Sequence, residues 1–488
     1  MPSSRKSELG AERYEARIQQ QTENPFATLI PDQQIAIIPS FTLESGVTLR
    51  NVPLAYTTRG KLSADADNVM VICHALTGSA DVGDWWGPLI GGPGRAFDTS
   101  RFFIVCMNSL GSPYGTASPV TAKDGDPEKG IYGPEFPLTT IRDDAKLHKL
   151  LLDELGVRQV AVVIGGSMGG MLVLEWAYFG KDYVRCIIPI ATSSRHSAWG
   201  ISWGEAQRQS IYADPKYEDG YYSFSDPPAT GLGAARMAAL LTYRSRNSFE
   251  TRFGRNIPDP SRRQTIRERP QPTTPSEAHF QIHNDGHKIT RTSTNNSRTT
   301  TPPQMSDPTE ATGQSLDPQF SGPKAGSLTG GDALPSSTYF SAQSYLRYQG
   351  EKFVKRFDSN CYIAISRKLD THDVSRYRAD SIPEALAMIE QPTLVLGIES
   401  DGLFTFAEQE ELAEHIKNAR LERIDSQEGH DAFLLQFEQV NRYILQFLGE
   451  MLPDIMSQKG EQVEAASVGQ LLKSSTFGEA EVEDITAW

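Results

Sequence analysis

The sequence predicts an α/β protein in which helices cover both faces of a mainly parallel sheet and further helices form an inserted cap. Short apolar runs alternate with helix-like stretches in two separate parts of the chain, which is the pattern of strand–helix–strand units. A glycine-rich turn with a serine near its centre, residues 165–170, lies between an apolar run and a helix-like stretch. A long segment that breaks this rhythm separates the two parts, so we expect it to be inserted between core strands.

Six short runs are expected to form core strands. Five of them are nearly continuous in apolar residues, and the sixth, 420–424, follows a helix-like stretch where the strand–helix pattern resumes. The six runs comprise residues 69–73, 102–107, 160–164, 186–191, 393–398 and 420–424. Residues 140–155 carry apolar side chains at the spacing of an amphipathic helix, among them Ile141, Leu147 and Leu151. Helices are also expected over 171–179, 406–417 and 433–448.

The chain is expected to divide into a core in two parts and a cap between them. The expected segments are an N-terminal extension at 1–34, core at 35–194, helical cap at 195–380, core at 381–452 and a flexible acidic tail at 453–488. Within the cap, residues 258–337 are dense in Ser, Thr, Pro, Arg and Asn, with Phe280 and Phe320 as the only aromatic residues. Such a segment cannot bury enough apolar surface to offset its ordering entropy, so we expect disorder there.

The composition disfavours several classes of function. The formal net charge of −14 disfavours binding to nucleic acid or to an anionic membrane, since phosphate groups would be repelled on average. The four cysteines show no CxxC spacing, which favours a reduced, intracellular protein. No apolar run reaches the length of a membrane span, and the first residues lack the apolar stretch of a secretory signal. We therefore expect a cytoplasmic protein without a metal ion or a bound cofactor.

The glycine-rich turn contains the candidate nucleophile, Ser167. The order of strand, Gly-x-Ser-x-Gly turn and helix is typical of a nucleophile elbow, in which small residues let strand and helix pack closely and leave the hydroxyl exposed. The Met168 N–H then lies at a helix N-terminus, where it can stabilise an oxyanion. The bare pattern also arises by chance, so the hypothesis requires a base, an acid and a second oxyanion donor.

The base and the acid are expected in loops that follow core strands. His430 lies between the last strand and the last helix, where the α/β-hydrolase fold supplies its base, and Asp401 follows the strand at 393–398. Ser167, Asp401 and His430 occur in the chain order of that fold. The imidazole would take the serine proton, and the carboxylate would fix the imidazole tautomer. Glu399 is the alternative acid, but it lies nearer to the end of the strand.

The loop after the strand at 69–73 is expected to supply the second oxyanion donor. It reads His74-Ala75-Leu76-Thr77-Gly78, and the Leu76 N–H is the donor that we expect. We expect His74 to pack this loop as a structural residue. Two other histidines, His148 and His415, are expected on helix surfaces, and His279, His283 and His287 fall in the segment expected to be disordered.

Six stretches of the chain together resemble the homoserine O-acetyltransferases, most closely the fungal form. They are residues 74–78, 91–98, 108–111, 165–175, 400–404 and 429–433. The resemblance extends over about residues 35–255 and 338–450. It implies an α/β-hydrolase fold with a helical cap, and an acyltransferase of methionine biosynthesis.

The resemblance also implies substrates, partners and two further site residues. Acetyl-CoA would be the co-substrate, and its acetyl group would pass through an acetyl-serine enzyme to the hydroxyl of L-homoserine in a ping-pong reaction. The chain would form a homodimer through its cap. Arg208 matches the residue that holds the substrate carboxylate, and Asp431 matches the residue that receives the substrate ammonium. Without the resemblance, Arg208 could be a surface helix charge and Asp431 a helix cap.

Three alternative activities remain open from the residues alone. A serine O-acetyltransferase or an O-succinyltransferase of the same family would use the same groups, and a carboxylester hydrolase would use the same triad with water as acceptor. Homoserine and serine differ by one methylene, which is worth only about 1–3 kcal/mol of selectivity. No glycine-rich phosphate loop indicates where the CoA phosphates bind.

Overall fold

The computed structural model describes residues 21–257, 273–287 and 340–460. The chain divides into two units, one formed by Met1–Pro258 and Phe340–Trp488 and the other by Asp259–Tyr339. Over the three described ranges, no helix is both long and apolar enough to cross a membrane.

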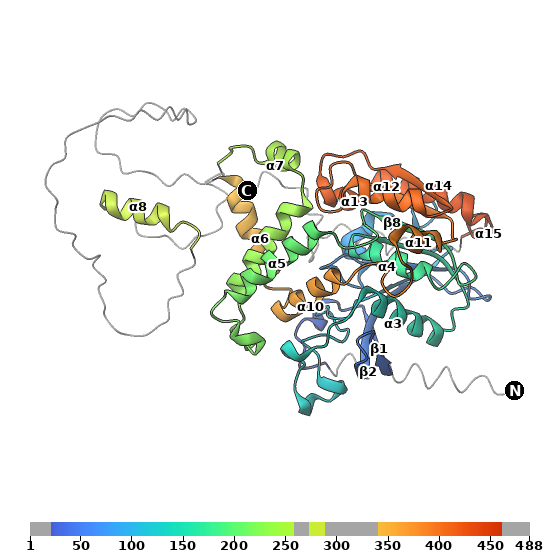
Figure 1. Cartoon of the computed structure of the whole chain (residues 1–488), viewed down its shortest axis with the longest axis horizontal. Helices are drawn as coiled ribbons and strands as arrows, with labels where there is room; N and C mark the ends of the chain where they lie inside the picture. Colours follow the sequence, from blue (N-terminus) through green and yellow to red (C-terminus); the bar gives the residue numbers. More distant parts are fainter. Residues whose placement is uncertain (1–20, 258–272, 288–339, 461–488) are drawn as a thin grey trace. The chain divides into compact units, whose positions relative to one another are not determined.

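An eight-stranded sheet forms the centre of the larger unit (Figure 1), with the strand order β1-β2-β6-β3-β7-β8-β9-β10. β1 and β2 form an antiparallel pair at one edge, and β2 is also antiparallel to β6. All other neighbours are parallel, so the loops that follow β3, β7 and β9 leave the same edge of the sheet. The strands are β1 (Gln34–Thr42), β2 (Thr48–Arg59), β3 (Val69–Cys73), β6 (Phe103–Met107), β7 (Val160–Gly166), β8 (Val184–Ile190), β9 (Thr393–Gly397) and β10 (Ala419–Arg423). A separate parallel pair consists of β4 (Ile90–Gly91) and β5 (Phe97–Asp98).

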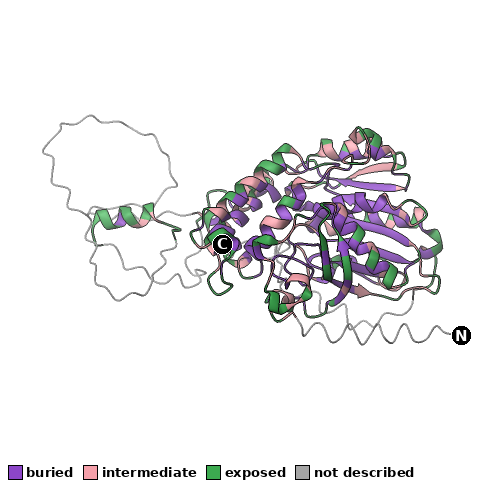
Figure 2. Cartoon of the chain, turned by 60° about the horizontal axis from the view of Figure 1, so that its bottom comes forward, coloured by how far each residue is buried: buried purple, intermediate pink, exposed green. Residues whose placement is uncertain are grey.

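The sheet is buried on both faces, as its continuous apolar strands predict. On β3, Val69, Val71 and Cys73 belong to one hydrophobic cluster, whereas Met70 and Ile72 belong to the other. Helices with residues in the first cluster include α3 (Ile141–Glu154), α4 (Met168–Ala177), α11 (Ile382–Ala387) and α12 (Phe406–His415). Those with residues in the second are α2 (Val82–Trp86), α13 (Ala432–Leu435), α14 (Phe437–Met451) and α15 (Pro453–Met456). Figure 2 shows buried strands between helices whose outer faces are exposed.

Helix α3 begins at a capping box and turns a polar residue into the core. The Thr140 side chain accepts a hydrogen bond from the Asp143 N–H, and the Asp143 carboxylate accepts one from the Thr140 N–H.

His148 on α3 is 1% exposed, because it lies on the same helix face as Ala145 and Leu152. Burial lowers the pKa of His148 to about 3, so the imidazole is neutral. The expectation that His148 is a surface residue was therefore wrong.

Five further helices of the larger unit lie in the segment expected to form a cap (Figure 1). α6 packs against α5 and α9, and α10 packs against α5. Where the chain leaves this group of helices and returns to it, the Ser341 N–H donates a 2.8 Å hydrogen bond to the Asn256 carbonyl. The five helices are α5 (Ala198–Tyr212), α6 (Ala229–Tyr243), α7 (Arg246–Arg252), α9 (Ser341–Phe353) and α10 (Ser359–Asp370).

The larger unit extends beyond the expected limits of the core at both ends. The Asn24 side chain donates to the Pro113 carbonyl at 2.8 Å, so the chain contacts core loops before residue 35. In the segment expected to be a flexible tail, α15 buries Ile455, and Arg185 binds Asp454 through two 2.7 Å contacts. The remainder of the expected tail, residues 461–488, lies outside the described residues.

The smaller unit contains helix α8 (Pro275–His283), within a segment whose composition predicts disorder. The Thr274 side chain accepts a hydrogen bond from the Glu277 N–H, and Pro275 occupies the first turn. A local cap and a proline that favours the first turn account for a helix here despite the polar composition. Residues 258–272 and 288–337 of the expected disordered segment lie outside the described residues.

A buried ion pair joins the cap to the core. Lys368 on α10 and Asp144 on α3 are both fully buried, and Lys368 Nζ lies 2.5 Å from Asp144 Oδ2. Nζ also donates to the Leu110 carbonyl at 2.6 Å, while Asp144 Oδ1 accepts from the Leu110 N–H at 2.8 Å. Burial lowers the pKa of Lys368, and the Asp144 charge opposes this shift.

Replacing Lys368 by methionine is expected to lower the free energy of unfolding by about 3–5 kcal/mol, because the Asp144 carboxylate stays buried without its cation. Lys149→Met is the matched control, since Lys149 pairs with Asp153 at 2.8 Å on the same helix α3 but in a solvent-exposed position. The control should lose about 0–1 kcal/mol. Urea unfolding followed by tryptophan fluorescence measures both variants, and equal losses would contradict the prediction.

Candidate active site

Ser167 lies in a strained turn between β7 and α4. Its backbone has φ 59° and ψ −127°, a left-handed conformation that is costly for a residue with a side chain. The Ser167 N–H donates to the Ile190 carbonyl at 3.0 Å, and the Thr192 hydroxyl donates to the Ser167 carbonyl at 2.8 Å. The end of the neighbouring strand β8 and the residues that follow it therefore hold the turn in place.

The glycines around Ser167 are required by close packing. A Cβ atom on Gly169 would lie 2.1 Å from the Cys73 carbonyl oxygen, which is backbone and cannot move aside. A Cβ atom on Gly166 would lie 2.4 Å from the ring of Phe433, three residues after His430. Small residues thus let α4 approach the end of β3 and let the loop that carries His430 approach the elbow.

His430 and Asp401, which are far apart from Ser167 in the sequence, are in direct contact with each other. His430 Nδ1 lies 2.7 Å from Asp401 Oδ2, and both side chains are almost fully buried. The other carboxylate oxygen of Asp401 accepts hydrogen bonds from the Leu403 and Phe404 N–H groups at 2.8 and 3.0 Å. These two bonds fix the carboxylate, and the carboxylate orients the imidazole.

Glu399, the alternative acid, lies elsewhere. It forms a 2.7 Å ion pair with Arg423, and its side chain is 59% exposed. Of the two carboxylates, it is Asp401 that contacts His430.

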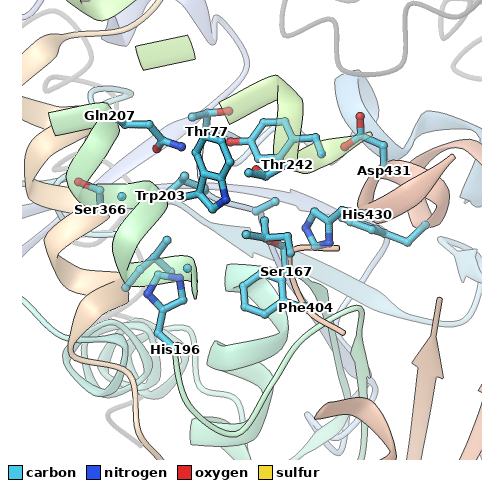
Figure 3. Close-up of a pocket in the computed structure, with 18 of the residues that line it drawn as sticks. Thr77, Ser167, His196, Trp203, Gln207, Thr242, Ser366, Phe404, His430 and Asp431 are labelled. Carbon is cyan, nitrogen blue, oxygen red and sulfur yellow. The ribbon is translucent and has the colours of Figure 1, made fainter. Parts of the chain in front are cut away.

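Ser167 and His430 line one pocket, where Figure 3 shows their side chains close together. The His430 ring packs against the rings of Phe404, Phe433 and Tyr243, with centroids 5.3, 5.6 and 6.3 Å away. Core residues, among them Ser167 and His430, line one part of this pocket. The cap helices contribute Trp203, Gln207, Thr242 and Ser366 to the rest of its lining.

The two expected oxyanion donors lie at the ends of neighbouring strands. Leu76 lines the pocket in the loop after β3, and its N–H donates to no other group within the part of the chain that the structure describes. Met168 is the first residue of α4, where an N–H has no partner inside the helix. Both amides follow the ends of β3 and β7, which are adjacent parallel strands, so they lie at the same edge of the sheet as Ser167.

Arg208, expected to bind the substrate carboxylate, is buried on α5 and already pairs with two carboxylates. Its Nη2 lies 2.8 Å from Asp370 and 2.9 Å from Glu205. Its Nη1 donates to the hydroxyl of Ser366 at 3.3 Å. The residues that line the pocket include Ser366 and Gly204 but not Arg208 itself. A substrate carboxylate at Arg208 would therefore compete with Asp370 and Glu205.

Asp431, expected to receive the substrate ammonium, lines the pocket and is held by Arg244. Arg244 Nε lies 2.9 Å from Asp431 Oδ2, and Arg244 Nη1 lies 2.7 Å from Glu428. Burial by itself lowers the pKa of Arg244, but the charges of Asp431 and Glu428 raise it. Asp431 is the N-cap residue of α13, but its side chain makes no capping hydrogen bond there. The alternative role of Asp431 as a helix cap is therefore wrong.

Two arginines and one tryptophan near the pocket were missed from the sequence. Arg244 contacts Asp431, and Arg236 lies buried on α6 with its guanidinium 5.3 Å from the ring centroid of Tyr243, a pocket residue. Trp203 on α5 lines the pocket (Figure 3). An available signal for Arg236 was an arginine within the small and apolar residues of 229–243, which indicates a buried charge with a specific role.

The arrangement suits acyl transfer through serine. An imidazole oriented by a carboxylate can take the serine proton, and two backbone N–H groups can stabilise the oxyanion that forms when the serine attacks a carbonyl carbon. The cap over the pocket provides surfaces that can select an acyl acceptor.

Comparisons with known proteins give the family. The chain matches a family model described as alpha/beta hydrolase fold over residues 68–437. It is 69% identical over 483 residues to a homoserine O-acetyltransferase of Emericella nidulans. The aligned residues cover 97% of this chain and 98% of that protein.

Solved structures with the same fold include both a hydrolase and a transferase. Esterase E22 matches with a TM-score of 0.63 and 21% identity, over 85% of this chain and 99% of that one. A homoserine O-acetyltransferase from Bacillus anthracis matches with a TM-score of 0.61 and 19% identity, over 88% and 99%. Because two different activities match equally well, these structures show the fold alone.

Asp401→Asn is expected to lower the rate of Ser167 acylation by roughly 10³–10⁴-fold, because an amide facing Nδ1 favours the wrong imidazole tautomer. Glu399→Gln, which removes a carboxylate two residues away, should leave the rate within about twofold of wild type. The measurement is the burst of p-nitrophenolate released from p-nitrophenyl acetate. A large loss in the Glu399 variant, or none in the Asp401 variant, would reverse the assignment of the acid.

Proposed function

Because this chain belongs to the homoserine O-acetyltransferases, a family with the α/β-hydrolase fold, we propose that it transfers the acetyl group of acetyl-CoA to the side-chain hydroxyl of L-homoserine. The 69% identity over nearly the whole of both chains carries this proposal. The contact between His430 and Asp401 beside Ser167 supports an acetyl-serine intermediate.

In the first half-reaction, His430 takes the proton of the Ser167 hydroxyl as its oxygen attacks the carbonyl carbon of the thioester. The N–H groups of Leu76 and Met168 stabilise the tetrahedral oxyanion. When the intermediate collapses, the carbon–sulfur bond breaks and CoA leaves as a thiol with the proton from His430. Acetyl-CoA is thus a co-substrate, and the reaction needs no bound cofactor.

In the second half-reaction, His430 takes the proton of the homoserine hydroxyl, whose oxygen attacks the acetyl-serine carbonyl. The same two amides stabilise the second oxyanion, and collapse returns the proton to Ser167 and releases O-acetylhomoserine. Transfer has to outrun hydrolysis. The buried, cap-covered site limits productive water, and binding of homoserine raises its effective concentration beside the ester.

A free amino acid is a zwitterion, so its site needs an anion and a cation. For the ammonium we propose Asp431, which lines the pocket next to His430. For the carboxylate we propose Arg208, with Arg236 as a second candidate. Arg208 would have to exchange one of its two carboxylate partners for the substrate, whereas Arg236 is favoured by its position over Tyr243, which lines the pocket.

The pathway, the location in the cell and the oligomeric state are proposed from the same family membership. The product, O-acetylhomoserine, would serve methionine biosynthesis. We also propose a cytoplasmic location and a homodimer formed through the cap. Exposed apolar side chains on the cap helices support a self-association surface, among them Trp199, Ile201 and Leu241.

Ser167→Ala is expected to abolish both the covalent acetyl-enzyme and transfer to homoserine, because no nucleophile remains to accept the acetyl group. Mass spectrometry of the intact chain after incubation with acetyl-CoA measures the intermediate. In the wild type, release of CoA should rise at least about tenfold when homoserine is added. Release at the full rate without homoserine would instead establish a hydrolase, and equal rates with L-serine would establish a broader acceptor range.

Arg208→Lys and Arg236→Lys are expected to separate the two candidates for carboxylate binding. The variant that loses the substrate contact should raise the KM for homoserine by about 10–100-fold, because lysine lacks the two-pronged geometry of arginine. The KM for acetyl-CoA provides the internal control and should change little. An unchanged homoserine KM in the Arg208 variant would remove Arg208 from the proposal.

A further inference from the structure

The loop that supplies the Leu76 amide is held by a buried histidine. His74 is 1% exposed, and its Nδ1 lies 2.8 Å from the Ala75 carbonyl oxygen. The same oxygen accepts a 3.0 Å hydrogen bond from the Gly78 N–H. The Ala75 carbonyl and the Leu76 N–H belong to one peptide group, whose C=O and N–H point in opposite directions. Two donors on the carbonyl therefore fix the direction in which the Leu76 N–H points.

The surroundings of His74 select one tautomer. The Ser109 N–H donates a 3.0 Å hydrogen bond to His74 Nε2, so Nε2 has to be the unprotonated acceptor. The ring proton then lies on Nδ1, where it donates to the Ala75 carbonyl. Burial lowers the pKa of His74 to about 4, which keeps the ring neutral and its two nitrogens in these opposite roles.

Ser109, whose N–H sets this tautomer, precedes a residue that is anchored to the cap. Leu110, directly after Ser109, donates its N–H to Asp144 at 2.8 Å and accepts from Lys368 on α10 at 2.6 Å. A second buried cation of the cap segment, Arg356, donates to the Thr77 carbonyl at 3.1 Å on the other side of Leu76. The loop is therefore fixed both through Ser109 and through Thr77.

We propose that His74 is a positioning residue for the oxyanion hole, whose Nδ1–H holds the peptide between Ala75 and Leu76 with its N–H directed at the reacting carbonyl. The proposal rests on the proposed acyl transfer through Ser167. It assigns His74 a role in the rate at which Ser167 is acylated. A hydrogen bond to the carbonyl also polarises the peptide group, which makes its N–H a stronger donor. The ring does not touch the substrate and takes no proton from it.

The test compares p-nitrophenyl acetate with p-nitrophenyl thionoacetate, in which sulfur replaces the carbonyl oxygen. Sulfur accepts hydrogen bonds poorly, so an intact oxyanion hole favours the oxygen ester. His74→Leu is expected to lower the acylation rate for the oxygen ester by about 10–100-fold and to reduce the oxygen-to-sulfur rate ratio by about tenfold. A merely structural defect would lower the acylation rates for both esters by the same factor. An unchanged oxygen-to-sulfur rate ratio in His74→Leu would therefore overturn the proposal.

Two further variants keep the test decisive. His74→Asn keeps an N–H donor near the position of Nδ1 and should restore the ratio to within about threefold of wild type. His372→Leu is the matched control, because His372 is another buried histidine, bonded to the Ser193 carbonyl at 3.0 Å rather than to the Ala75–Leu76 peptide. Its ratio should equal that of wild type, and a fall as large as that in His74→Leu would contradict a specific role for His74.

The ester assay also separates this proposal from the proposed function. It needs neither homoserine nor CoA, so failure of the chain to acetylate homoserine would leave the ester ratio interpretable. In the full reaction, His74→Leu should lower kcat while the KM for homoserine stays within about twofold. A change confined to the homoserine KM would place His74 in acceptor binding and overturn the positioning role.

Discussion

The left-handed turn at Ser167 is the constraint on which the rest of the site depends. It lifts the hydroxyl above the end of the sheet, and it is held by hydrogen bonds from Ser167 to Ile190 and from Thr192 to Ser167. Only glycine fits at 166 and 169, since a larger residue would meet Phe433 or the Cys73 carbonyl. The same short contacts that make the turn possible therefore bring the loop that carries His430 and the end of β3 close to the serine.

Buried charges from the cap support the groups that the core presents. Lys368 contacts Leu110 beside Ser109, and Arg356 contacts Thr77 in the loop that carries Leu76. Arg244 pairs with Asp431 beside His430. Each of these cations is largely withdrawn from solvent and has a carboxylate or carbonyl partner. The cap helices therefore help to hold the loops that carry Leu76 and His430.

Much of the core could be predicted from the sequence, because buried parallel strands are continuous apolar runs. The family predicted from six motifs is confirmed by the 69% identity, and the α/β-hydrolase fold is confirmed as well. β1 and β2 were not predicted as strands although each contains a short apolar run, because a proline, Pro39 or Pro53, lies within each of them and argues against a strand. Two other misses have different causes. His148 lies at helical spacing from Ala145 and Leu152, so its burial could have been predicted from the sequence. Nothing local to Arg208, by contrast, shows that Asp370 reaches it from α10.

The 2.8 Å hydrogen bond between Ser341 and Asn256 means that the chain leaves and re-enters the larger unit at neighbouring points. The length of chain between 257 and 340 is thus free to vary at little cost to the fold, since doubling a loop adds only about 0.6 kcal/mol of closure entropy. That junction offers a natural position for grafting a foreign domain, such as a fluorescent reporter, without separating the serine from its base.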